Sequence, residues 1–263
     1  MKVILHADDF GFDKDTTEAT IELLEEGSLT SASIMATMPA VDDALDYAAA
    51  HKEKSFGVHL TYVDGLKSAY REQESSLLDA KGLFYPSNDV RKKAIKLSLR
   101  KQDIVEESLA QIEIVKKAGI EISHLDSHGH LHKFPSFLLA LPEIKMRSGI
   151  ERVRRVQNVF IHYPRLSPST ILNRCFDLRI SRTCRTTDYF YMSANSMDTE
   201  WAESIIDQMN RLPEHAIIEI AVHPGKADTE EERWRISEYK DIRVFASLLR
   251  KQGKHQLITW KEV

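Results

Sequence analysis

Four of the eleven histidines of this chain lie within the segment HLDSHGHLHKF, at residues 124–134. They are His124, His128, His130 and His132, and Asp126 lies among them. An isolated histidine is more often a hydrogen-bonded core or loop residue than a metal ligand. Four histidines at short, even spacing, at the end of a run that is typical of a strand, favour a site for a divalent metal ion.

Three further segments place residues of the same chemistry at the ends of predicted strands. HADDFG carries Asp8 and Asp9, GVHLT carries His59, and AVHPG carries His223. Imidazole and carboxylate groups suit zinc and other first-row ions, and three protein ligands leave a coordination position for a water that the ion makes acidic. Adjacent aspartates on an extended chain point to opposite sides, so one can bind the ion while the other contacts the water or a neighbouring histidine.

Each of these residues has an ordinary structural explanation when it is taken alone. Adjacent acidic residues at a strand end are often helix-capping groups, and His59 among apolar neighbours is more often a core histidine. His223 precedes Pro224 and Gly225, a pair typical of turns. Their joint occurrence favours a functional site. The histidines without such neighbours are interpreted as surface or core residues: His6, His51, His162, His215 and His255.

Short β-rich runs alternate with longer amphipathic runs along the chain. Eight strands are predicted, at 2–7, 31–36, 56–61, 121–126, 152–156, 188–192, 216–222 and 255–260. Helices are predicted between them, at about 15–26, 41–52, 103–118, 136–147, 168–181, 198–211 and 237–251. Alternating βα units imply a parallel sheet, and this number of strands favours an α/β fold of the (β/α) TIM-barrel-like type, with residues 1–263 as a single domain. Barrel strands end on one rim, where the four motifs are expected to meet.

The long connection 62–90 interrupts this alternation. A connection of this length is usually functional or mobile, and it follows a strand whose end carries His59. We therefore expect it to border the substrate site. Arg154, on the predicted strand 152–156, is assigned to the same pocket as a substrate contact.

Composition and charge limit the class of partner. Hydrophobic residues make up 42% and charged residues 29%, as in a folded protein, and the net charge of −4 offers no basic footprint for nucleic acid. The chain contains neither GxGxxG after its first strand nor a P-loop motif, which disfavours nucleotide-binding folds. Two cysteines do not make a disulfide framework. No run approaches 18 apolar residues and no signal peptide is evident, so we expect a cytoplasmic protein without membrane insertion.

The motifs HADDFG, TSAS, GVHLT, SHLDSHGHLH and IEIAVHPG occur in the order and spacing of a known family. Over nearly its whole length the chain resembles the YdjC-like carbohydrate deacetylases, the group that includes the chitooligosaccharide deacetylases. The resemblance implies a barrel-like α/β fold and one divalent ion, magnesium or zinc. It also implies an N-acetylated sugar as substrate, from which the enzyme removes the acetyl group.

The resemblance further implies roles for individual residues. His59 and His128 are implied as metal ligands, and the Asp8–Asp9 pair as the remaining carboxylate ligand and the catalytic base. Within that pair we assign Asp9 to the ion and Asp8 to the base. His223 is assigned to protonation of the leaving amine. Two more histidines of the segment 124–134, His130 and His132, are assigned to substrate binding. His124 is expected to be structural.

Two other functional classes stay open at this point. Another metal hydrolase on a similar barrel, such as a phosphoesterase, would prefer more carboxylates, often two ions, and basic residues that hold phosphate. A non-catalytic sugar-binding or metal-binding relative would keep the fold without needing a base beside an ion. A homodimer is also compatible with the sequence.

Overall fold

Seven parallel strands form the centre of the computed structural model, which describes residues 1–64, 66–70, 74–161, 168–193, 201–230 and 233–263. In chain order the strands are β1 (Lys2–Phe10), β2 (Ser31–Ile34), β3 (Ser55–Leu60), β4 (Ile122–Ser127), β5 (Tyr189–Met192), β6 (Ile217–Val222) and β7 (Gln256–Leu257). Their order in the sheet is β4-β3-β2-β1-β6-β5, and β7 pairs with the start of β1. The predicted α/β, barrel-like fold is confirmed, in the form of a curled sheet.

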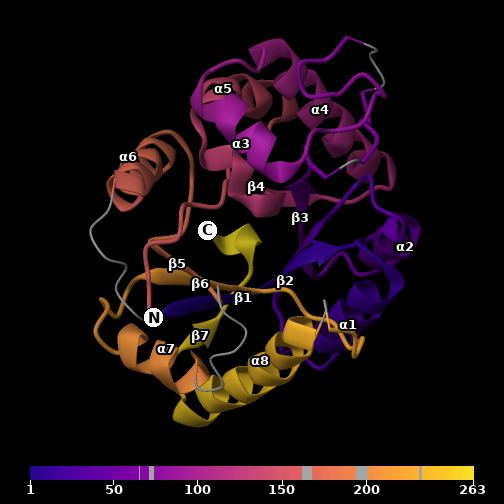
Figure 1. The fold of residues 1–263 in the computed structure, drawn as a ribbon. Helices are drawn as coiled ribbons and strands as arrows, with labels where there is room; N and C mark the ends of the chain where they lie inside the picture. Colours follow the sequence, from indigo (N-terminus) through magenta and orange to yellow (C-terminus); the bar gives the residue numbers. More distant parts are fainter. Residues whose placement is uncertain (65, 71–73, 162–167, 194–200, 231–232) are drawn as a thin grey trace.

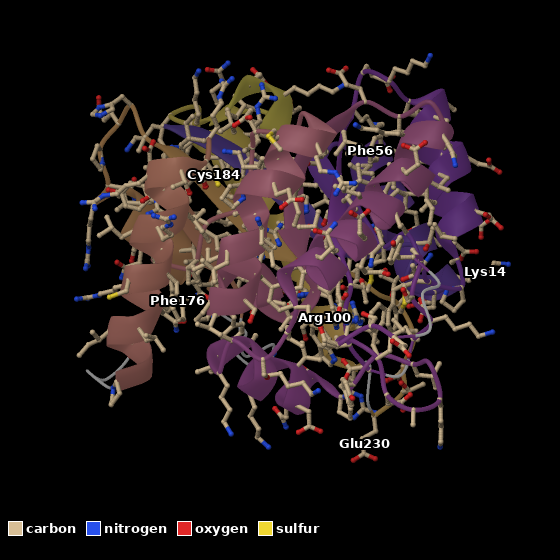
Figure 2. All side chains as sticks on the ribbon, turned by 90° about the horizontal axis from the view of Figure 1, so that it is seen from above. Lys14, Phe56, Arg100, Phe176, Cys184 and Glu230 are labelled. Atoms are coloured by element: carbon tan, nitrogen blue, oxygen red, sulfur yellow. The ribbon has the colours of Figure 1, made fainter. Side chains whose placement is uncertain are left out.

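Helices surround the curled sheet (Figure 1). They are α1 (Lys14–Glu25), α2 (Val41–Ala50), α3 (Ser87–Ile95), α4 (Lys101–Lys117), α5 (Pro135–Ser148), α6 (Pro168–Thr183), α7 (Trp201–Met209) and α8 (Arg233–Gln252), with the short 3-10 helices η1 (His128–Lys133) and η2 (Trp260–Glu262). Charged side chains such as Lys14 and Glu230 extend from the outer surface (Figure 2). Among the described residues, no helix has both the length and the apolar character needed to cross a membrane.

The strand predicted at 152–156 is wrong, because this segment forms isolated bridges instead. The backbone N–H of Arg154 donates to Leu125 O at 2.9 Å, and the N–H of Val153 donates to Arg185 O at 2.9 Å. Farther along, the N–H of Asn158 donates to Phe190 O at 3.2 Å. The segment therefore spans the gap between the outer strands β4 and β5 with isolated pairs of hydrogen bonds rather than a continuous ladder. The barrel is distorted and has seven strands in the described part of the chain rather than eight.

The two faces of the central strands differ in chemistry. On β1, Val3, Leu5 and Ala7 join the large apolar core shared with the helices, whereas His6 and Asp8 alternate with them and face the opposite side. The neighbouring strands repeat this pattern, and their inward-facing residues are fully or almost fully buried: Ser33, His59, His124, Asp126 and Glu219. TIM barrels usually fill this space with branched apolar residues, whereas the interior of this barrel carries polar and titratable side chains.

The C-terminus closes the amino-terminal end of this interior, and Figure 1 shows η2 inside the ring of strands. The Trp260 ring stacks on the His124 imidazole, with centroids 4.4 Å apart and planes 10° from parallel. Its indole N–H donates to Glu219 Oε1 at 3.2 Å. Ile4 and Ile258 pack around the same ring. The indole therefore supplies the apolar seal beneath the polar interior.

The described residues of the connection between β3 and α3 include a packed part. Leu77 and Phe84 are each 1% exposed, and antiparallel bridges join Lys67 to Leu83 and Leu78 to Phe84. The predicted long loop 62–90 is therefore packed in part, and its last residues form the start of α3, which begins at Ser87.

Gly57 offers a test of the polar interior. A Cβ atom at this position would lie 2.4 Å from Cε1 of the His124 ring. We expect Gly57→Ala to lower the free energy of unfolding by about 1–3 kcal/mol, since the ring is held between Gly57 and Trp260 and has little room to move. Urea denaturation measures the loss.

The matched control is the same substitution in a His124→Ala background. Removing the imidazole removes the clash, so Gly57→Ala should then cost much less, and the double-mutant cycle should show coupling between the two positions. An equal cost in both backgrounds would contradict the close contact.

Candidate metal centre

Asp9, His59 and His128 lie together at the carboxyl ends of the strands. Asp9 Oδ1 lies 3.0 Å from His128 Nδ1 and 3.3 Å from His59 Nε2. One nitrogen or oxygen atom from each residue falls within 4.8 Å of the others, which is close enough for all three to contact one ion. Asp9 and His59 are 1% exposed, whereas His128 is half-buried. A carboxylate and two imidazoles with one open side fit a site for a first-row divalent ion.

The end of β1 separates the two adjacent aspartates. Asp9 has a φ of 60°, in the left-handed region that aspartate tolerates better than most residues, and the register between β1 and β2 shifts between Ala7 and Phe10. The N–H of Phe12 donates to Asp9 O at 2.9 Å and closes the turn. This local backbone turn directs Asp9 to the histidines at the rim, while Asp8 keeps the inward direction of the strand.

Asp126 orients His59 from behind. Its Oδ1 accepts a hydrogen bond from His59 Nδ1 at 2.9 Å, so the imidazole turns Nε2 toward Asp9. Burial by itself would lower the pKa of His59, but the Asp126 carboxylate, together with Asp8 and Asp9, outweighs it and raises the pKa to about 10. Carboxylates in this position fix the tautomer and the ring orientation of metal-binding histidines.

Arg154 lies behind Asp8, inside the barrel. Its guanidinium contacts both oxygens of Asp8 at 2.8 Å, and it also reaches Asp126 and Glu219, each at 2.7 Å. Burial alone would raise the pKa of Asp8, but Arg154, together with the nearby histidines, outweighs it and holds that pKa well below its usual range. Asp8 is therefore ionised at neutral pH. Arg154, which the sequence assigned to the substrate, has an exposed fraction of 0%.

His223 faces Asp8 at the rim. Its Nε2 lies 3.7 Å from Asp8 Oδ2, and its Nδ1 donates to Glu238 Oε2 at 3.2 Å. Burial would lower the pKa of His223, but the hydrogen bond and the charge of Glu238 raise it overall. A histidine with a raised pKa, next to an ionised aspartate, is equipped to donate a proton.

Helix α8 supplies three residues that the sequence analysis missed. Arg235 Nη2 donates to Asp9 Oδ2 at 2.8 Å, Trp234 places its ring 5.3 Å from that of His223, and Glu238 holds the same histidine. The helix was predicted to begin at about 237, whereas it begins at Arg233, so these residues were read as loop or as helix start. The available signal was the spacing of four between Trp234 and Glu238, which places both on one face.

The other histidines of the segment 124–134 lie outside the trio formed by Asp9, His59 and His128. His132 is buried, its Nδ1 lies 2.7 Å from Ser127 Oγ, and burial lowers its pKa to about 3. His130 is half-buried, with its ring 5.8 Å from that of Phe190. The left-handed backbone of Gly129 and His130 turns η1 back on itself, so that neighbours in sequence face different surroundings.

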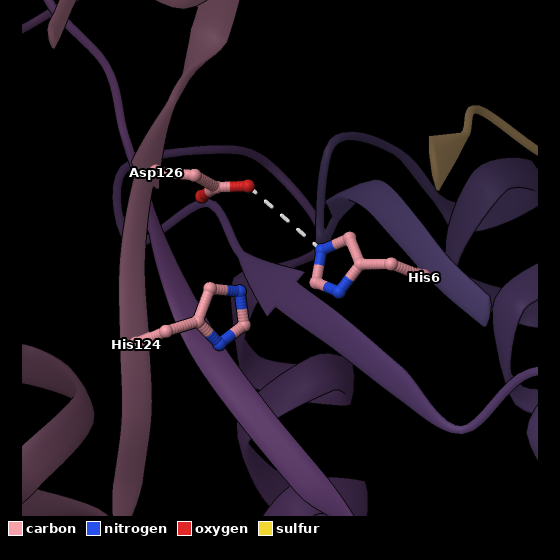
Figure 3. A group of neighbouring side chains, drawn as sticks. All are labelled: His6, His124 and Asp126. Atoms are coloured by element: carbon pink, nitrogen blue, oxygen red, sulfur yellow. Dashed lines mark ion pairs between the residues drawn. The ribbon is translucent and has the colours of Figure 1, made fainter. Parts of the chain in front are cut away.

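A second group of possible ligands, His6, His124 and Asp126, lies deeper in the barrel (Figure 3). His6 Nε2 lies 3.8 Å from Asp126 Oδ2, but the same oxygen is 2.7 Å from Arg154 Nη1. A metal ion there would need the same carboxylate oxygen that the buried guanidinium contacts, which is electrostatically unfavourable. At Asp9, in contrast, Arg235 contacts Oδ2, whereas His59 and His128 face Oδ1. We therefore assign no ion to this group. His6, set aside in the sequence, alternates with Asp8 on β1, and that period of two was the signal for it.

A pocket of about 650 Å³ opens beside the trio. His128 and Arg235 form its polar edge next to Asp9. Val63, Asp64 and Leu66 of the connection after β3 contribute to its wall. The pocket provides access to the trio from outside the barrel.

The support of His59 by Asp126 can be tested by metal titration. We expect Asp126→Asn to weaken zinc binding by about 10–100-fold, because the amide no longer fixes the imidazole or its charge. Competition with a chromophoric chelator measures the affinity. Asp177→Asn is the control, since Asp177 also pairs with an arginine, Arg155, but lies away from the trio. Equal affinities for both variants would contradict the orienting role.

Comparisons with known proteins agree with the resemblance seen in the sequence. A carbohydrate deacetylase of Brevibacillus brevis is 27% identical over 228 residues, which cover 87% of this chain and 83% of that protein. A crystal structure of a protein from Enterococcus faecalis V583 shares the fold, with a TM-score of 0.80 at 22% identity over 99% of this chain and 98% of the other. The CE4 domain of a multidomain xylanase from the hindgut metagenome of Trinervitermes trinervoides is a more distant neighbour, with a TM-score of 0.50 at 10% identity over 99% of this chain and 87% of the other. The family model of YdjC-like proteins matches residues 2–257, and the chain therefore belongs to the YdjC-like family.

Proposed function

We propose that this protein is a metal-dependent carbohydrate deacetylase that hydrolyses the acetamide group of an N-acetylated sugar. The observation that carries the proposal is the Asp8–His223 pair, 3.7 Å apart, directly beside the cluster of Asp9, His59 and His128. This arrangement combines a proton acceptor, a proton donor and an ion site at one rim. The activity named for the Brevibacillus brevis relative supports the same reaction.

Asp9, His59 and His128 would hold the ion. Two imidazoles among three ligands suit zinc or another first-row ion better than magnesium, which prefers oxygen ligands. When bound, such an ion polarises a carbonyl group and makes water acidic near neutral pH.

The residues of the chain would then move the protons. Asp8, ionised and held by Arg154, accepts a proton from the attacking water. His223, kept protonated by Glu238, donates a proton to the leaving nitrogen as the C–N bond breaks. The products are acetate and a free amino sugar. In this proposal Arg154 acts on the substrate only through Asp8, whereas the half-buried His130 contacts the substrate and His132 supports η1 through Ser127.

Charge pairing favours an amide over a phosphate ester. A phosphoesterase needs basic groups that face the phosphate. Two arginines that lie beside the candidate metal centre engage carboxylates instead: Arg154 pairs with Asp8, and Arg235 pairs with Asp9.

The proposal is tested by acetate release from N-acetylglucosamine and its oligomers, with and without a chelator. We expect His128→Ala to remove both the ion and the activity, because one of three ligands is lost. Asp8→Asn should keep the ion and lose about 10²–10⁴-fold in kcat, because the proton acceptor is gone.

His130→Ala is the control for metal content, since it alters the same turn without touching the trio. Full metal content and turnover in His128→Ala would contradict the assignment of His128 as a metal ligand. Loss of the ion from Asp8→Asn would show that the two aspartates have exchanged roles.

The role of Glu238 predicts a shift in pH dependence. Glu238→Gln removes the charge that raises the pKa of His223, so that pKa should fall. Because His223 must be protonated to act as an acid, the alkaline limb of the kcat/KM profile should move to lower pH. The rate on the acidic side of the optimum should change far less.

Asp241→Asn is the matched control, because it removes a carboxylate from the same helix, where Asp241 accepts a hydrogen bond from Trp201. Its pH profile should follow that of the unaltered protein. An alkaline limb that stays in place in Glu238→Gln would exclude His223 as the acid.

A further inference from the structure

Most of the accessible surface of the pocket beside the trio is apolar. It is formed by segments that follow β1, β2 and β3 and by the start of α8. Its apolar members include two methionines, two aliphatic residues and two aromatic rings: Met35, Met38, Val63, Leu66, Phe12 and Trp234. Met35 and Val63 are each 1% exposed and lie at the base of the pocket, whereas Phe12, Leu66 and Trp234 are partly exposed and present its accessible apolar surface.

The polar residues of the same wall are engaged within the protein. Asp13 Oδ1 accepts the N–H of Thr16 at 2.8 Å and caps α1. Asp64 Oδ1 accepts the N–H of Ser87 at 2.9 Å, and Thr61 Oγ1 donates to His59 O at 3.2 Å. At the inner edge, His128 and Arg235 both bond to Asp9. The wall therefore presents much apolar surface and few polar groups that face a ligand.

The size and chemistry of the pocket favour an aliphatic chain over a pyranose ring as its ligand. Its volume of about 650 Å³ lies within the range of pockets that bury a whole small ligand, far more than an acetyl methyl group needs. A pyranose ring buried here would lose hydrogen bonds from its hydroxyl groups to water without full replacement. An aliphatic chain would gain from leaving water at the same place.

We propose that this pocket receives an aliphatic chain attached to the amino sugar, so that the substrate is amphiphilic. The chain is either an N-acyl group longer than acetyl or an aliphatic group at the anomeric carbon. This inference rests on the proposed function, because it names the class of substrate for the same site. The amino sugar itself lies toward the rim, beside Asp8 and His223.

Two series of compounds test the inference and distinguish the two attachments. The first is glucosamine carrying N-acetyl, N-butyryl or N-hexanoyl groups. The second is N-acetylglucosamine as its methyl, butyl or octyl β-glycoside, below the micelle concentration. We expect kcat/KM to rise by about fourfold per added methylene in the series whose chain enters the pocket.

Leu66→Gln should flatten that rise, because it places an amide in the wall. The control is Met146→Gln, since Met146 is 74% exposed on α5 and does not line the pocket; it should leave the rise and the basal activity unchanged. A rise in either series that Leu66→Gln flattens supports the inference. Values of kcat/KM that stay level in both series overturn it and leave deacetylation standing.

Calorimetry with octyl and methyl β-glucoside, which carry no acyl group, tests the pocket without turnover. Tighter binding of the octyl compound, lost in Leu66→Gln, supports an aliphatic site, and equal binding together with a level N-acyl series overturns it. If none of the amide compounds is hydrolysed, the proposed function fails, and the calorimetry still decides whether the pocket takes an aliphatic chain.

Discussion

The structure depends on one buried cation, the guanidinium of Arg154. A charge with no exposure is costly unless carboxylates surround it, and Asp8, Asp126 and Glu219 do so at 2.7–2.8 Å. Each carboxylate also serves a second partner. Asp8 faces His223, Asp126 holds His59, and Glu219 accepts the indole N–H of Trp260. The ion pairs of Arg154 therefore connect the candidate catalytic residues at the rim to the packing of Trp260 at the opposite end of the barrel.

The alternation of the strands makes this arrangement possible. On β1 and its neighbours, one face packs aliphatic residues against the helices, and the other face carries the charged network. A slip of one residue would exchange the two faces and expose charges to the apolar core. Burial raises the pKa of Glu219 to about 7 although Arg154 opposes the shift, which shows how strongly the interior penalises any carboxylate without full compensation. The polar interior therefore fixes the register of the strands and also positions the side chains of the candidate metal centre.

Two different surfaces meet at the rim. The inner one is charged and holds its side chains by ion pairs, whereas the outer one, formed by the segments after β1, β2 and β3 and by α8, is largely apolar. Arg235 lies at their border, between Asp9 and the rings of Phe12 and Trp234. Gly225 allows this contact, because a Cβ atom there would lie 2.9 Å from that of Arg235. Helix α8 can therefore approach the ends of β1 and β6 closely enough to complete the site.

The sequence by itself determined the parallel α/β barrel, the family, and the meeting of Asp9, His59 and His128 at one rim. The fold and the common rim follow from local patterns, because strands that alternate with helices run parallel and end on one side. The family, and the choice of His59 and His128 as ligands, came from the resemblance of the motifs to those of the family. Tertiary structure alone decided the bridging by residues 152–156, the burial of Arg154 among three carboxylates, and the contact of Arg235 with Asp9. Those depend on partners distant in the chain: Arg154 needs carboxylates from β1, β4 and β6 to be buried, and a single sequence does not show which strands will face one another.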